Sequence, residues 1–141
     1  MADANRYEVR LGDRIAEIEI TGTPDPKDLE AALAEVLSHK GFRLGMSLLF
    51  VDRTTGFNPD RPRIEAAVAM IAGSTRQMDN HIAVVVESES HYGIARGFAE
   101  CAESHDLILM PFREIETARN WLIAQQSDSR YFPIPPTPGP G

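Results

Sequence analysis

Residues 46–52 read MSLLFVD, an almost continuous apolar run that ends in an acid. Such a run is typical of a β-strand whose two faces are both covered. Residues 81–86 (HIAVVV) and 107–110 (LILM) have the same character, and Pro111 follows the last run at its end, a place where proline is tolerated. The sequence therefore predicts three buried strands in one sheet.

The clearest helix is predicted just before the first of these strands. Asp25 can accept hydrogen bonds from the free amides at the helix start, and Pro26 suits the first turn. Gly41, followed by Phe42, predicts a left-handed stop with an apolar contact behind it. Between these ends, apolar residues recur at i, i+3, i+4, i+7 and i+8, which makes one buried stripe: Leu29, Ala32, Leu33, Val36 and Leu37.

Three more segments show the same helical spacing. Residues 64–71 form a stripe that we expect to end at Gly73, residues 94–102 form a stripe that ends near Ser104, and residues 115–122 form the last. At the start of the chain, alternating residues 7–11 and 15–21 flank a turn at Gly12 and Asp13, which predicts a β-hairpin.

The resulting order is β-β-α-β-α-β-α-β-α. Buried strands that alternate with amphipathic helices predict an α/β fold with a mixed, mostly parallel sheet, in which the N-terminal hairpin is followed by βαβαβα units. We expect the first strand to join the sheet antiparallel at or near an edge. Residues 1–125 are predicted to form one domain, and residues 126–141, which hold five of the ten prolines, a C-terminal tail.

The composition excludes several classes of function. The 141 residues include 21 acidic and 14 basic ones, a net charge of −7 that disfavours nucleic-acid binding. A single cysteine can form no intrachain disulfide and no multi-cysteine zinc site, which favours a reducing cytoplasm. The apolar runs are five or six residues long, so we expect neither membrane insertion nor export.

No motif for catalysis is found in the sequence. It has no nucleophile elbow, no phosphate-binding loop and no dinucleotide fingerprint, so we expect a protein that is not an enzyme, with no catalytic residue and no cofactor. The four histidines show no metal-binding spacing, so we expect no metal site. Cys101 lies on an apolar helix face, where a buried thiol is inert.

The pattern resembles the STAS or anti-sigma-factor-antagonist-like superfamily, also known as SpoIIAA-like, in its small, uncharacterised bacterial branch. The features that carry the resemblance are the N-terminal hairpin, the strand that ends at Asp52, residues 92–98 (YGIARGF) and residues 112–122. The resemblance covers residues 5–125 and extends more broadly to CRAL-TRIO lipid-binding lobes. It implies a STAS-like fold and a role in binding a protein partner or a small ligand.

In anti-sigma-factor antagonists, an Asp-Ser-Ser/Thr-Gly motif carries a phosphorylated hydroxyl directly before a helix. The matching residues here are Asp52, Arg53, Thr54, Thr55 and Gly56. The resemblance implies that Thr55 takes the hydroxyl position, with Thr54 beside it. This chain departs from the motif, because Arg53 is an extra residue and residues 57–62 delay the helix. Both a phosphorylated switch and an ordinary turn, with hydroxyls bonded to the local backbone, stay open.

The loop after the MSLLFVD strand is the first candidate binding site, because ligands collect at the carboxyl ends of strands in open α/β sheets. Arg53, Arg61 and Arg63, close to Asp52, could bind a small anion or an acidic partner, or could pair with neighbouring acids and keep the loop soluble.

Two glycines in the third predicted helix are the second candidate. Gly93 and Gly97 are costly in a helix, so we expect something to approach that face closely: the sheet or another helix, a second molecule, or an acyl chain in a cavity. Met70, Met78 and Met110 are adaptable apolar side chains, which we expect in the core.

Three hypotheses for function follow. The first is a non-catalytic binding or regulatory module that binds a protein partner or forms a homodimer. The second is a carrier of a small apolar, lipid-like or anionic ligand, which requires a cavity of a few hundred cubic ångströms. The third is chemistry at the Asp52 loop, either a phosphorylation switch at Thr54 and Thr55 or an enzyme whose carboxylate lies in a cleft.

Overall fold

The computed structural model describes residues 7–23, 25–55 and 58–126. The elements follow the predicted order: β1 (Tyr7–Leu11), β2 (Ile15–Gly22), α1 (Pro26–Ser38), β3 (Ser47–Thr54), α2 (Arg61–Ser74), β4 (His81–Val86), α3 (Glu89–Ala102), the short 3-10 helix η1 (Glu103–His105), β5 (Ile108–Phe112) and α4 (Ile115–Gln126).

The five strands form one sheet in the order β1-β2-β3-β4-β5. β1 pairs antiparallel with β2, and the pairs β2–β3, β3–β4 and β4–β5 are parallel. The mixed, mostly parallel sheet with its antiparallel edge strand is therefore confirmed. Each parallel connection passes through a helix, as parallel pairing requires.

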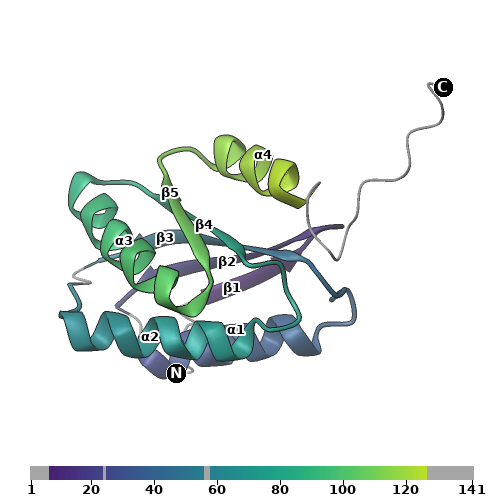
Figure 1. Ribbon diagram of the computed structural model, residues 1–141, viewed down its shortest axis with the longest axis horizontal. Coiled ribbons are helices and arrows are strands. Elements are labelled where there is room, and N and C mark those ends of the chain that lie inside the picture. Colours follow the sequence, from purple (N-terminus) through teal and green to yellow (C-terminus); the bar gives the residue numbers. More distant parts are fainter. Residues whose placement is uncertain (1–6, 24, 56–57, 127–141) are drawn as a thin grey trace.

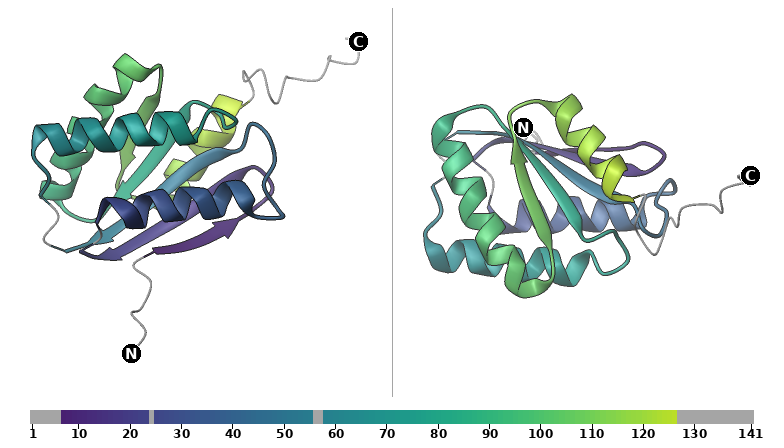
Figure 2. Two further views of the ribbon diagram at one scale, coloured as in Figure 1. Left: turned by 90° about the horizontal axis from the view of Figure 1, so that it is seen from below. Right: turned by 45° about the horizontal axis from the view of Figure 1, so that its top comes forward.

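The helices divide unequally between the two faces of the sheet. Figures 1 and 2 show α1, α2 and α3 on one face and α4 on the other. The face covered by α1, α2 and α3 holds the larger core. There, alternate residues of the central strands, such as Leu48 and Phe50, pack with Leu33, Val68 and other helical side chains. The smaller core joins the opposite face to α4: Leu49, Val51, Ala83, Val85, Ala118 and Leu122.

The C-terminal end of α4 is fixed to the sheet by one side chain. Gln126 is fully buried, and its Nε2 donates to the carbonyl oxygen of Arg14 at 2.8 Å and to Oγ of Ser47 at 2.6 Å. Gln126 is thus the last residue of the helix and part of the folded unit. The division into a domain of residues 1–125 and a tail of residues 126–141 stays a prediction: α4 includes Gln126, and residues 127–141 of the predicted tail lie outside the described residues.

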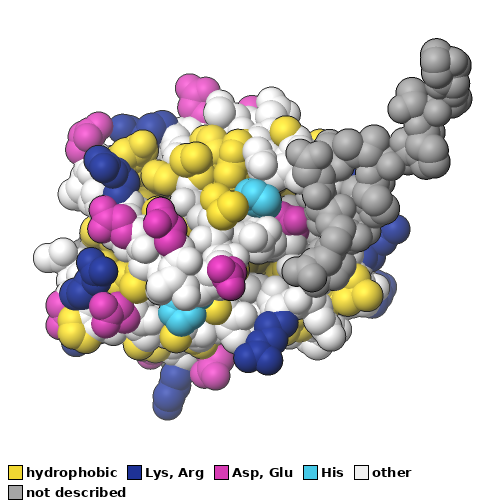
Figure 3. Space-filling model, in the orientation of Figure 1, with side chains coloured by type: hydrophobic (Ala, Val, Ile, Leu, Met, Phe, Trp, Pro, Cys, Tyr) yellow, Lys and Arg dark blue, Asp and Glu magenta, His cyan; other side chains and the backbone are white. Residues whose placement is uncertain are grey.

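β5 differs from the prediction of a third strand buried on both faces. Leu109 is buried in the larger core, but Ile108 and Met110 are 46% and 40% exposed. The reason is that β5 is the edge strand and α4 packs mainly on β3 and β4. Figure 3 shows apolar side chains gathered on this part of the surface. Pro111 lies inside the strand, not after it, and an edge strand tolerates a proline there.

The start of α1 agrees with the prediction and its end does not. Oδ1 of Asp25 accepts from the amides of Lys27 and Asp28 at 2.9 and 3.1 Å, and Oδ2 of Asp28 accepts from the Asp25 amide at 2.9 Å, which makes a capping box. The left-handed stop at Gly41 is wrong, because α1 ends at Ser38 with an extended His39. The turn after His39 is closed by two hydrogen bonds: Nδ1 of His39 accepts from the Gly41 amide at 2.9 Å, and the His39 carbonyl oxygen accepts from the Phe42 amide at 2.9 Å.

The sheet face over β1 and β2 that α4 leaves uncovered is charged. Glu17 accepts from Arg119 at 2.8 Å, and Glu19 accepts from Arg10 at 3.1 Å. The hydrogen bond to Glu17 raises the pKa of Arg119, and that to Glu19 raises the pKa of Arg10. These groups are partly solvated, so each pair adds little to stability. Among the described residues, this part of the sheet therefore carries ion pairs at Glu17 and Glu19.

Candidate functional site

At the carboxyl end of β3, two polar side chains lie on the face of the sheet that α1, α2 and α3 cover. Strand alternation puts Asp52 and Thr54 on the same side as Phe50. Oδ1 of Asp52 accepts from the Thr54 hydroxyl at 2.6 Å and from the Thr54 amide at 3.0 Å. Asp52 is half-buried and Thr54 is buried. The hydroxyl of Thr54 therefore bonds to a neighbouring carboxylate, and not to the backbone as a simple turn would have it.

His91 joins this pair from α3, and the sequence analysis missed its role. Its Nδ1 lies 3.6 Å from Oδ2 of Asp52, too far for a hydrogen bond but close enough for an ionic attraction when the ring is protonated. The position follows from the helix start: Ser88 caps α3 and its Oγ accepts from the His91 amide at 3.1 Å. Because β3 and β4 are parallel neighbours, the helix that follows β4 begins beside the end of β3. From this relation between neighbouring parallel strands, the sequence could have predicted that His91 lies near Asp52.

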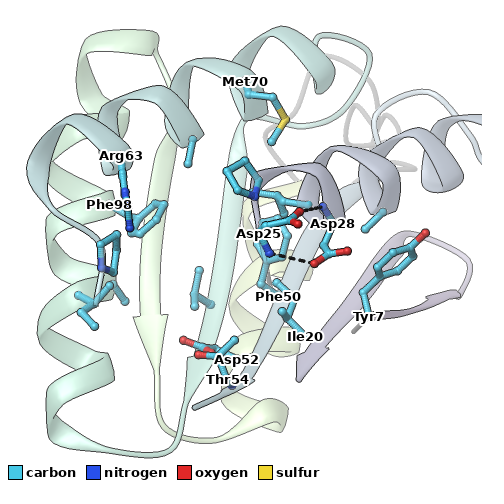
Figure 4. A pocket seen from close by; sticks show the side chains of 18 of the residues that line it. Tyr7, Ile20, Asp25, Asp28, Phe50, Asp52, Thr54, Arg63, Met70 and Phe98 are labelled. Atoms are coloured by element: carbon cyan, nitrogen blue, oxygen red, sulfur yellow. Dashed lines mark hydrogen bonds between the residues drawn. The ribbon is translucent and has the colours of Figure 1, made fainter. Parts of the chain in front are cut away.

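A cavity of about 640 Å³ lies between the sheet and helices α1, α2 and α3, next to Asp52 and Thr54. Figure 4 shows Ile20 and Phe50 on its sheet side, Met70 across from them on α2, and Asp52 and Thr54 together at the end of β3. Most of the remaining wall is apolar: Leu29, Ala32, Ala66, Ala67, Val84, Ile94, Ala95, Phe98 and Leu109. A cavity with mostly apolar walls and a polar group at one end is the usual arrangement of a small-molecule site.

The three arginines of the predicted cluster are dispersed. Arg53 lies on the opposite sheet face from Asp52, where it pairs with Glu19 at 2.7 Å and with Glu87. Arg61 pairs with Glu65 one helical turn away at 3.2 Å. Arg63 lines the cavity from α2, and among the described residues no carboxylate forms an ion pair with its guanidinium. A common anion site made of all three arginines is therefore not formed.

The other candidate residues have separate positions. Thr55 is exposed, and its amide donates to the carbonyl oxygen of Gly22 at 2.8 Å; Gly56 lies outside the described residues. At Gly97 an added Cβ would lie 3.5 Å from Cδ1 of Ile64, so the close neighbour is α2. At Gly93 an added Cβ would meet no described atom within 4 Å, so the close approach expected there is not found.

The chemistry available at this site is hydrogen bonding and burial of apolar surface. Within residues 7–23, 25–55 and 58–126, no three His, Cys, Asp or Glu side chains are grouped as metal ligands. Cys101 is a buried free thiol, as predicted. In the described part of the chain, no helix has the length and apolar character needed to span a membrane.

Comparisons with known proteins bear on the fold. No protein-family model matches the chain, and no curated protein matches it. Among solved structures, it is similar to an uncharacterized protein of the DUF3478 family with a SpoIIAA-like fold, from Shewanella loihica PV-4. The two chains are 12% identical, the alignment covers 82% of this chain and 91% of the other, and the TM-score is 0.54. The chain therefore has a SpoIIAA-like, STAS-like fold, as its sequence predicts; the likeness to CRAL-TRIO lobes stays a prediction.

Proposed function

We propose that this protein is a non-catalytic binding protein that holds a small, predominantly apolar molecule between its sheet and helices α1, α2 and α3. The observation that carries the proposal is the cavity of about 640 Å³ with largely apolar walls. Its volume falls within the roughly 300–1,000 Å³ that is usual for small-molecule sites. The space is partly open to solvent, so a ligand can enter it, and its position at a polar strand end supports ligand binding.

The arrangement of Asp52, Thr54 and His91 supports binding over catalysis. An activated hydroxyl needs a base that takes its proton and a third group that orients this base. Oδ1 of Asp52 lies 2.6 Å from the Thr54 hydroxyl, but Nδ1 of His91 lies 3.6 Å from Oδ2, too far for the hydrogen bond with which a third group would orient this carboxylate. The hydroxyl already donates to the carboxylate, which makes the pair a fixed acceptor at the polar end of the cavity.

Titration with the neutral fluorophore Nile red tests the proposal. Ala67 is half-buried on the cavity side of α2, whereas Ala69 on the same helix is exposed. The natural chain should bind Nile red saturably at one site, and Ala67→Phe should weaken this binding at least about tenfold, because the ring occupies the cavity. Ala69→Phe, the matched control, should bind as the natural chain does. Equal binding by both variants, or signal that rises without saturation, would refute the proposal.

Native mass spectrometry of the gently purified chain gives an independent test. The proposal expects a co-purified small molecule that leaves the protein on mild activation. The same mass should be absent from Ala67→Phe and present in Ala69→Phe. A bound mass that both variants retain equally would place the ligand elsewhere and contradict the proposal.

Self-association is a second candidate function, favoured by the exposed side chains of Ile108 and Met110 on the edge strand β5. Adjacent exposed apolar side chains are a common feature of protein interfaces. Light scattering after size exclusion should then give a dimer mass that Ile108→Glu reduces to a monomer mass. Ile123→Glu, at an exposed apolar residue on α4, is the control. A monomer mass for the natural chain at all concentrations would rule this candidate out.

A further inference from the structure

The polar end of the cavity has an acceptor that is only partly satisfied. Asp52 lies on the sheet side of the cavity, and its side chain is 14% exposed. Oδ1 accepts two hydrogen bonds, both from Thr54. Oδ2 lies 3.6 Å from Nδ1 of His91, which is beyond hydrogen-bonding distance. Oδ2 is not closed off from water, so it is an accessible acceptor at the polar end of the cavity, and a bound molecule that carries a donor can reach it.

The remaining charged groups at the cavity set the sign of its field. Asp25, Asp28 and Glu30 line it at the start of α1, and the carboxylates of Asp25 and Asp28 take part in the capping box. Arg63 lines it from α2, and this residue is exposed. The described lining thus holds four carboxylates, those of Asp25, Asp28, Glu30 and Asp52, against the single guanidinium of Arg63, so the field inside the cavity is negative. A carboxylate or phosphate placed there would be repelled.

We infer that the molecule bound in this cavity carries a hydrogen-bond donor, a hydroxyl or protonated amino group, that binds Oδ2 of Asp52, while its apolar part lies between Phe50 and Met70. This inference rests on the proposed binding function and adds the chemical class of the ligand. The ligand is thus an apolar alcohol or amine, and a fatty acid of the same chain length is a poor substitute.

Calorimetric titration with decanol, decylamine and decanoate, below their critical micelle concentrations and at neutral pH, tests the inference. The three molecules share one apolar chain and differ at the head group. The natural chain should bind decanol and decylamine at least about tenfold more tightly than decanoate, because a hydrogen bond to a charged group is lost with decanoate and repulsion replaces it. This ranking needs no variant, so it decides the inference even if a substitution prevents folding.

The variant Asp52→Asn tests whether the Asp52 side chain causes the difference in affinity among the three molecules. The substitution keeps the shape and an acceptor for Thr54, but it presents an amide in place of Oδ2. The preference for decylamine over decanoate should fall at least about tenfold. Asp13→Asn removes the same charge in the exposed β1–β2 turn, outside the cavity, and should leave the preference unchanged.

The outcomes separate the two proposals. Decanoate binding as tightly as decanol, blocked by Ala67→Phe, would overturn the inference and leave the binding function standing. Decanoate binding most tightly and being lost in Arg63→Gln would show that an anion is held by Arg63, which also overturns the inference. Absence of saturable binding for all three molecules would overturn the binding function, and the inference with it.

Discussion

Filling the cavity should raise the stability of the protein, and this can be worked out from two alanines of α2. Ala67 is half-buried and lines the cavity, whereas Ala69 is exposed on the same helix. Full burial of a phenylalanine side chain stabilises by roughly 1.5–3 kcal/mol, so a half-buried site gains about 1 kcal/mol. Ala67→Phe and Ala69→Phe both lose roughly 0.5 kcal/mol of helix propensity, and this loss cancels when the two are compared.

Urea unfolding followed by circular dichroism measures the difference. Ala67→Phe should have a free energy of unfolding roughly 1 kcal/mol higher than Ala69→Phe, with the same dependence on urea, because empty space of about 640 Å³ accommodates the ring. If side chains already filled this space, the ring would overpack the core and cost about 1–3 kcal/mol. A lower stability for Ala67→Phe than for Ala69→Phe would therefore refute the reasoning that the space is empty.

Three other substitutions test the local structure, each by the same urea unfolding. Asp25→Ala removes the acceptor of the α1 capping box and should cost about 1 kcal/mol; no loss would show that the box is not formed in solution. Gly93→Ala should stabilise by roughly 0.5–1 kcal/mol, because its Cβ meets no described atom within 4 Å, and a loss would reveal a close neighbour. Gly97→Leu should cost about 1–3 kcal/mol, because Cδ1 of Ile64 lies 3.5 Å from the new Cβ, and neutrality would mean that α2 and α3 are loosely packed.

The central strands could be predicted because both faces of the sheet are covered there. In β3, Leu48 and Phe50 face α1, α2 and α3, while Leu49 and Val51 face α4, so an unbroken apolar run is required. The run at residues 107–110 looks the same but lies at the sheet edge, where Ile108 and Met110 are exposed. An apolar run shows that a strand exists; how many neighbours and helices cover it depends on the whole topology.

The site was predicted in part. Asp52 was expected at a strand end, and it lies there, but its place beside a cavity depends on how far α2 stands from the sheet, which no local pattern encodes. Arg53 was assigned to the loop that follows Asp52. Because β3 continues to Thr54, strand alternation turns Arg53 to the opposite face. A predicted strand that extended to Thr54 would have placed Arg53 and Asp52 on opposite faces of the sheet. The parallel pairing of β3 and β4 would have predicted that His91, at the start of the helix after β4, lies near Asp52.

A crystal structure of the chain grown with decanol tests the central claim most directly. Binding between the sheet and helices α1, α2 and α3 predicts continuous electron density between Phe50 and Met70, with the hydroxyl end toward Asp52. Density for decanol on the outer face of β5, with the space beside Phe50 closed by side chains, would contradict it.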